Sequence, residues 1–323
     1  MSKLVKLIAS LFLVLTLVGC STNDVEETNT PMATDESATS EVVKLKVLAP
    51  KGATALPFAK MMAEGTHDVT TVDGSDLLQS SLVSPNSEYD VIVAPTNLGV
   101  KLISAHKSNY RLIDVLTWGN LYLVAENGVQ LSDGSDIALF GENAVVGLVF
   151  EDLFSEMNLN KTYYNSVQDA QIALLSGNTS IALLAEPAAS AAIAKGKENG
   201  KDLTIMGNIQ DLWKDKYGDS YPQASIFVST DAIDNKLNSV VSLVQDLSAF
   251  VEEVNNNSQV IANYIDTVKP ENLGVPNANI AIKTWNSLNI KLVKGSEVID
   301  QLNSLLKLFN VEDARGAIVY VND

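Results

Sequence analysis

Short apolar runs alternate with amphipathic segments from residue 44 onward, and this alternation predicts strands and helices in turn. The β-branched run 90–94 is typical of a strand that is buried on both faces. Pro95 ends this strand because proline has no N–H to donate to a ladder. Thr96 or Asn97 can then cap a helix, and apolar residues at helical spacing follow. The stretch therefore predicts a strand that leads into a helix N-terminus across a tight corner. Open α/β sheets bind ligands at such corners.

The same strand–corner–helix element recurs along the chain. It is predicted at 48–55, 93–99, 147–152 and 184–190. In the second half of this region, 135–140 is predicted as a short helix and 144–148 as a strand. Two strand-rich links, 118–125 and 221–229, interrupt the alternation, and the remainder of the chain is predicted to be mostly helical.

This order of elements predicts an α/β protein with two lobes, two crossover hinge strands and a ligand cleft between the lobes. The predicted first lobe comprises residues 44–120 and 226–323, and the predicted second lobe comprises residues 121–225.

The N-terminus has the pattern of a bacterial export signal. Lys3 and Lys6 precede the apolar run 7–18, which is too short to span a bilayer comfortably. The segment 17–20 resembles a lipobox that ends at Cys20, the only cysteine of the chain. We therefore predict a lipoprotein signal peptide at 1–19 and lipidation of Cys20. The other interpretation is an ordinary signal peptide that happens to contain a cysteine.

Residues 20–43 carry no lysine or arginine and are rich in Ser, Thr, Asn, Asp and Glu. Such a segment buries too little apolar surface to offset its ordering entropy, so we predict a disordered acidic tether. A lipid on Cys20 would anchor the protein to the extracytoplasmic face of the cell membrane without spanning it.

Composition excludes several classes of function. The 323-residue chain has a formal net charge of -17, which argues against nucleic-acid binding. Its only arginines, Arg111 and Arg315, are too few for a site in which several guanidinium groups clamp a carboxylate. No zinc-binding, nucleophile-elbow or P-loop motif is present, so we expect no metal, no cofactor and no enzymatic activity.

Several segments together resemble a known family. They are 47–53, 89–97, 116–124, 174–177, 181–187 and 221–222. In their order and spacing behind the lipobox, they resemble the solute-binding lipoproteins of ABC importers with the type 2 periplasmic-binding-protein fold. The similarity is greatest to the branch of nitrate, sulfonate, taurine and thiamine-precursor binders. The resemblance implies an ABC permease and an ATPase as partners, and capture of a small molecule in the cleft.

The resemblance also implies which residues touch the ligand, at the predicted corners and links. These are Gly52, Ala53, Thr96, Asn97, Trp118, Gly119, Asn120, Gly147, Glu186 and Tyr221. Each has a structural alternative. Trp118 either stacks on a planar ligand or fills the lobe junction, and Tyr221 is a candidate lid aromatic. Asn120 either binds a polar group or caps a turn, and Glu186 either faces the ligand or complements a helix dipole.

The ligand class stays open at this point. Helix N-termini favour a small anion, whereas the carboxylates of Glu151, Asp152 and Glu186 favour a neutral or cationic heterocycle. The function has two further alternatives: a lipid-anchored sensor or adhesin that has kept the binding fold without transport, and, with less support, a cleft enzyme.

Overall fold

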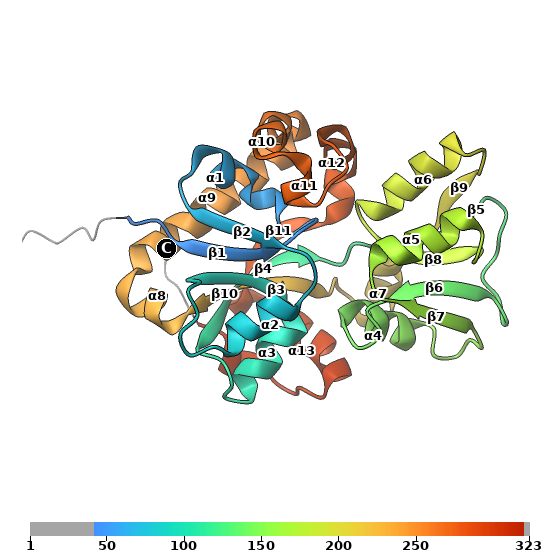
Figure 1. Ribbon diagram of the computed structural model, residues 1–323. Coiled ribbons are helices and arrows are strands. Elements are labelled where there is room, and N and C mark those ends of the chain that lie inside the picture. The colour runs from blue at the N-terminus through green and yellow to red at the C-terminus, as the bar shows by residue number, and fades with distance from the viewer. Residues whose placement is uncertain (1–41, 320–323) are drawn as a thin grey trace, which may run out of the picture. The chain divides into compact units, whose positions relative to one another are not determined.

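The computed structural model describes residues 42–319, which belong to one compact unit that begins at Ser40 (Figure 1). The predicted signal peptide, Cys20 and nearly all of the predicted tether lie outside the described residues. Between residues 42 and 319, no helix combines the length and the apolar character that a bilayer crossing needs. Over the same range, His, Cys, Asp and Glu side chains form no group of three or more that could hold a metal ion.

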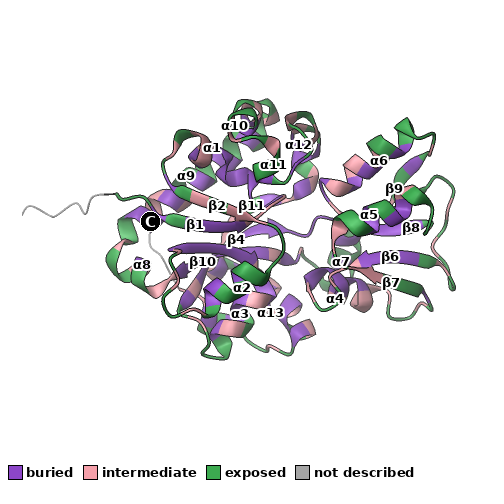
Figure 2. Ribbon diagram, in the orientation of Figure 1, coloured by how far each residue is buried: buried purple, intermediate pink, exposed green. Residues whose placement is uncertain are grey.

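Six strands form the first sheet, in the order β11-β4-β10-β3-β1-β2. Their bounds are β1 Lys46–Pro50, β2 Asp68–Val72, β3 Val91–Pro95, β4 Tyr110–Trp118, β10 Pro222–Ser229 and β11 Ile290–Lys294. Strand β1 is parallel to β2 and β3, whereas β10 is antiparallel to both of its neighbours. The central strands carry apolar residues toward both faces and are almost completely buried, as Figure 2 shows.

Helices cover both faces of this sheet. One face packs against α1 (Ala59–Glu64), α9 (Leu237–Asn256), α10 (Ile261–Val268) and α12 (Ala278–Thr284). The other face packs against α2 (Asp76–Val83), α3 (Thr96–Ser104) and α13 (Ile299–Leu306). Alternate residues of β1 show why both faces need cover, because Val47 and Ala49 belong to the first core and Leu48 to the second.

Five strands form the second sheet, in the order β7-β6-β8-β5-β9. They are β5 Leu121–Glu126, β6 Asp136–Phe140, β7 Asn160–Tyr164, β8 Ile181–Ala185 and β9 Leu203–Asn208. Helices α4 (Val145–Leu153) and α7 (Ile209–Tyr217) pack on one face, and α5 (Val167–Ser176) and α6 (Ala188–Glu198) pack on the other. As in the first sheet, three parallel strands are followed by an antiparallel strand that enters from the other sheet.

Two segments cross between the sheets, residues 119–120 after β4 and residues 218–221 before β10. The Gly119 N–H donates to the Tyr221 carbonyl over 3.2 Å, so the two crossings are bonded to each other. Asn289, beside β11, holds them from a third segment. Its carbonyl accepts from the Trp118 N–H at 3.0 Å, and its Nδ2 donates to the Gly119 carbonyl at 2.6 Å.

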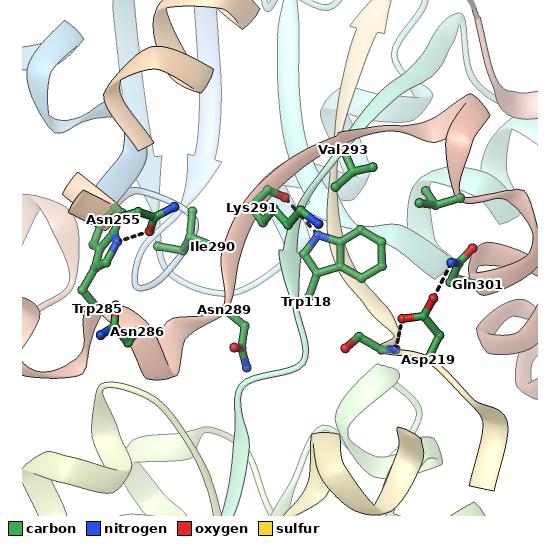
Figure 3. Close-up of a pocket in the computed structure, with 12 residues that line it drawn as sticks. Trp118, Asp219, Asn255, Trp285, Asn286, Asn289, Ile290, Lys291, Val293 and Gln301 are labelled. Carbon is green, nitrogen blue, oxygen red and sulfur yellow. Dashed lines mark hydrogen bonds between the residues drawn. The ribbon is translucent and has the colours of Figure 1, made fainter. Parts of the chain in front are cut away.

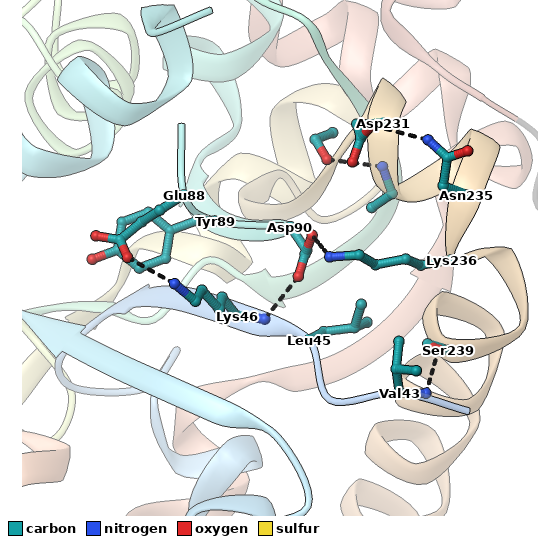
Figure 4. Close-up of polar contacts among 12 residues, drawn as sticks. Val43, Leu45, Lys46, Glu88, Tyr89, Asp90, Asp231, Asn235, Lys236 and Ser239 are labelled. Atoms are coloured by element: carbon teal, nitrogen blue, oxygen red, sulfur yellow. Dashed lines mark hydrogen bonds and ion pairs between the residues drawn. The ribbon is translucent and has the colours of Figure 1, made fainter. Parts of the chain in front are cut away.

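The described chain enters the first sheet through a small polar cluster, shown in Figure 4. The Val43 N–H donates to Ser239 Oγ at 2.9 Å. Asp90, only 7% exposed, accepts from the Lys46 N–H at 2.9 Å and from Lys236 Nζ at 2.7 Å. These bonds tie the beginning of β1 to β3 and to the junction of α8 (Thr230–Asn235) with α9.

The predicted strand at 90–94, the helix after it and the two strand-rich links are confirmed. Two predictions in the second sheet are wrong: residues 136–140 form strand β6, and residues 145–153 form helix α4. The valine-rich run 144–149 has the composition of a strand, but it folds as a helix that packs against β6, and Gly147 lets this helix approach the Gly141 carbonyl. The corner consequently lies at 141–144 and not at 147–152.

Candidate functional site

The parallel strands β1, β3, β6 and β8 each lead across a corner into a helical segment, and most of the predicted site residues lie at these corners. At the β1 corner, Gly52 has a φ of 99°, a conformation that suits glycine, and its N–H donates to the Leu273 carbonyl at 2.9 Å. Ala53 follows with 9% of its surface exposed. Gly52 thus shapes this corner and joins it to the C-terminal helices.

The β3 corner holds a polar group without a partner. Thr96 is completely buried, and its Oγ1 shares a 2.8 Å hydrogen bond with Ser225 Oγ of β10. Asn97 is 8% exposed, and its buried Oδ1 has no hydrogen-bond partner among residues 42–319. An unsatisfied buried polar atom costs about 1–3 kcal/mol. Such an atom at the start of α3 is a candidate binding group.

Asn120 links the first crossing to both sheets. Its N–H donates to Gln223 Oε1 at 3.2 Å, and its Oδ1 accepts from Gln223 Nε2 at 3.0 Å. Toward the second sheet, its carbonyl accepts from the Glu186 N–H at 3.0 Å, and its Nδ2 donates to the Glu186 carbonyl at 3.4 Å. Asn120 is only 3% exposed, and its N–H, carbonyl, Oδ1 and Nδ2 all form hydrogen bonds. It therefore holds the crossing in place.

Glu186, at the end of β8, is a buried carboxylate with 4% exposure. Its Oε2 accepts from the Ser190 N–H at 3.0 Å, and its Oε1 accepts from Ser190 Oγ at 2.7 Å. Burial raises the pKa of Glu186, and the two Ser190 donors oppose that rise. The carboxylate therefore complements the N-terminus of its own helix α6, as the dipole interpretation predicts.

Tyr221 is not a lid, because it is completely buried. Its ring lies under Gly119, whose added Cβ would stand 2.4 Å from Tyr221 Cζ. Its hydroxyl is 3.3 Å from Gln210 Oε1, and its ring meets Trp213 edge-on with centroids 5.3 Å apart. Burial raises the pKa of Tyr221 well above its ordinary value. Tyr221 and Gly119 are thus packing partners at the crossings.

Gly147 also packs, since an added Cβ there would lie 2.5 Å from the Gly141 carbonyl oxygen. The acidic residues further along α4 serve surface contacts: Glu151 pairs with Lys161, and Asp152 pairs with Lys216 at 2.9 Å. The corner between β6 and α4 therefore depends on glycine for its backbone packing, and the acidic side chains of α4 form ion pairs at the surface.

The Trp118 indole lines a hollow of about 410 Å³ beside edge strand β11 (Figure 3). Its Nε1 donates to the Lys291 carbonyl at 2.9 Å, and across the hollow Trp285 Nε1 donates to Asn255 Oδ1 at 2.7 Å. In the sheet order, β4 and β10 separate β11 from the corners of β3 and β1. The Trp118 indole thus packs toward β11 and belongs to the core between the first sheet and α3.

Sequence reasoning missed Gln223, Ser225 and Ser190. Gln223 and Ser225 are polar positions two residues apart in the mostly apolar strand β10, so the strand period puts both on one face. Ser190 stands four residues after Glu186, the spacing of one helical turn. The sequence signal that could have identified Gln223 and Ser225 is that they are polar residues within a buried strand.

No protein-family model and no curated protein matches the chain. Solved structures do match. A protein described as an ABC transporter from Parabacteroides distasonis aligns over 88% of this chain and 97% of its own, with 19% identity and a TM-score of 0.70. The aliphatic sulphonate binding protein of Escherichia coli aligns over 87% and 93%, with 12% identity and a TM-score of 0.65.

A third structure, from Candida albicans, is described as having the generic periplasmic binding protein fold. It aligns over 86% of this chain and 97% of its own, with 13% identity and a TM-score of 0.54. The protein has the type 2 periplasmic-binding-protein fold. The predicted fold class is therefore confirmed, with three parallel strands and one returning strand in each sheet. In this fold, the corners described above are the ends of the strands that face the junction of the two lobes.

Proposed function

We propose that this protein is the extracytoplasmic solute-binding component of an ABC importer. It captures a small molecule between its lobes and delivers it to a membrane permease that an ATPase drives. The observation that carries the proposal is the buried, unpartnered acceptor Asn97 Oδ1 at the β3 corner. A separate buried polar network joins Gln223, Asn120 and Glu186 at the crossings. The fold of the solved structures supports the proposal.

In the proposed site, Gly52 and Ala53 shape one wall, Thr96 and Asn97 form the second, and Asn120 and Glu186 face them from the crossing and the second lobe. The lobes are the bodies built on the two sheets. We place the return to the first lobe at Pro222, where β10 begins, a few residues before the sequence-based limit of 226. Lipidation of Cys20 would hold the protein at the extracytoplasmic membrane face.

Transport requires that the lobes close on the solute and open again. The two crossings are short and bonded to each other, so rotation about them can bring the corners together while the sheets stay rigid. A solute that bonds to groups from both lobes stabilises the closed state by its differential affinity for that state.

The test is native mass spectrometry of the full-length protein, extracted from membranes in mild detergent. We expect a bound small molecule that denaturation releases, and a smaller radius of gyration when this molecule is added back. A ligand at 100 times its dissociation constant should also add about 2.7 kcal/mol to the free energy of unfolding. If no small molecule of any charge is bound or stabilises the protein, the sensor or adhesin interpretation replaces this proposal.

A further inference from the structure

The segment 299–309, which comprises helix α13 and the turn after it, contributes to the hydrophobic cores of both lobes. Leu302 and Leu306 are completely buried in the core between the first sheet and α3. Leu305 and Phe309 belong instead to the core on one face of the second sheet. We propose that this segment is a strap that holds the two lobes at the angle seen in this structure. The strap would act in the same way whatever the cleft binds, so it does not depend on the proposed function.

The strap buries two apolar stripes. Leu302 and Leu306 are four residues apart, and so are Leu305 and Phe309, so each pair follows one side of the helical path. A helix that only covered the first sheet would bury a single stripe. The second stripe therefore has a separate function, which is contact with the other lobe.

Both ends of the strap are fixed to the first lobe. Before it, strand β11 pairs with β4 of the first sheet. After it, the Ala314 N–H donates to Asn303 Oδ1 at 2.8 Å, and the Val319 N–H donates to the Leu112 carbonyl of β4 at 3.0 Å. The chain thus leaves the first sheet and returns to it, and only the middle of this path contacts the second lobe.

The contact with the second lobe is a packed apolar cluster. Leu305 is completely buried and Phe309 is 6% exposed, in one cluster with Phe150 of α4 and Trp213 of α7. Leu308 packs against the same cluster. Exposing a buried phenylalanine side chain disfavours a state roughly ten- to hundredfold. A lobe rotation that withdraws Phe309 from the second lobe is therefore disfavoured by about this factor.

The strap is also bonded to the second crossing, as Figure 3 shows. Gln301 Nε2 donates to Asp219 Oδ2 at 2.6 Å, and Asp219 Oδ1 accepts from the Ser220 N–H at 2.7 Å. These two bonds, that of Gln301 first, lower the pKa of Asp219 below its ordinary value. A movement of this crossing against the first lobe must stretch the bond to Gln301, so the strap opposes the rotation at a second point.

Single-molecule energy transfer between dyes at Asn86 in the first lobe and Asn178 in the second measures the lobe angle of the full-length protein. Both positions are exposed, and attachment through non-natural amino acids leaves Cys20 unchanged. In Phe309→Ala, we expect other interlobe distances to be populated about tenfold more than in the unmodified protein. The matched control is Phe250→Ala, which removes a ring of 3% exposure from a core that contains first-lobe residues only. It should leave the distances unchanged.

A second variant guards against a folding defect in the first. Leu308 is only half-buried against the second lobe, so the fold should tolerate Leu308→Ala more easily. This variant should change the interlobe distances in the same direction as Phe309→Ala, and by less. Unchanged distances in both variants would overturn the proposal, and so would an equal change in Phe250→Ala. No solute is added in these measurements, so the proposed function stands or falls separately.

Discussion

Replacing Gly119 by alanine should strain the point at which the two crossings meet. The new Cβ would stand 2.4 Å from Tyr221 Cζ, 2.6 Å from Cε1 and 2.7 Å from the hydroxyl oxygen. Tyr221 cannot swing aside, because it is completely buried and its ring meets Trp213. The main chain of one crossing must therefore move away from the other, which stretches the 3.2 Å bond from the Gly119 N–H to the Tyr221 carbonyl.

The magnitude follows from two opposing effects. Overpacking a well-filled site typically costs about 1–3 kcal/mol. The loss of chain entropy in the unfolded state returns about 0.4–1 kcal/mol, because Gly119 does not have a positive φ. We therefore expect the free energy of unfolding to fall by about 1–2 kcal/mol, which for a protein of this size lowers Tm by several degrees.

Urea denaturation of the full-length protein measures this change. The matched control is Gly316→Ala, whose Cβ would meet no atom within 4 Å and which also lacks a positive φ. Adding Tyr221→Leu should relieve the clash, so the double variant should be more stable than the sum of the single effects predicts. If Gly119→Ala unfolds at the same urea concentration as Gly316→Ala, the Tyr221 ring does not exclude a side chain at position 119.

Three further changes probe the network around the sheets. Lys236→Met strands the buried Asp90 carboxylate and should cost about 1–3 kcal/mol of stability, measured by urea denaturation. Asn289→Ala removes the donor to the Gly119 carbonyl at a positive-φ position, and should cost about 1–2 kcal/mol and increase hinge motion in single-molecule distance measurements. Burial lowers the pKa of His67 below its ordinary value of 6.5, so as the pH falls the unfolded chain binds a proton before the folded chain does. The free energy of unfolding should therefore decrease as the pH drops below 6.5. In His67→Gln, this contribution to the pH dependence of stability should be absent.

The first two of these changes have matched controls. Lys46→Met breaks a pair with Glu88 in which both side chains are more than half exposed, and should change stability by less than about 1 kcal/mol. Asn286→Ala, in the exposed position three residues before Asn289, should leave the hinge unaffected. Equal effects at the paired positions would mean that burial does not set these energies.

Local patterns were sufficient to predict most of the first sheet, but not its edge strand β11, which lies in a region predicted to be mostly helical. The run at 90–94, the proline after it and the apolar stripe of α3 are all within 15 residues of one another, and each element follows from its own composition. The prediction of the second sheet failed where local propensity and burial disagree. Residues 144–149 are rich in valine, yet they pack as a helix because Gly147 lets the turn approach the Gly141 carbonyl. Nothing within the run itself signals that contact.

The candidate site was predictable only in part for a related reason. The corners at Gly52, Asn97 and Glu186 follow strands that could be recognised, so their positions were predictable. Their partners are distant: Gln223 is 103 residues from Asn120, and Ser225 is 129 residues from Thr96. The role of Tyr221 depends on such distant contacts, so its residue type alone suggested a lid where the structure shows packing.

In the proposed function, Asn120 connects solute capture to lobe movement. Its side chain and N–H bind Gln223 of the first sheet, while its carbonyl and Nδ2 bind the main chain of Glu186 in the second. A rotation of the lobes must either preserve these four bonds or exchange them. In the proposed function, a solute that bonds to both lobes acts on the residues that Asn120 joins, so binding and closure would share one set of hydrogen bonds. Asn120→Ala should therefore weaken solute affinity and reduce ligand-induced compaction together, whereas a variant in a site that only contacts solute would reduce affinity alone.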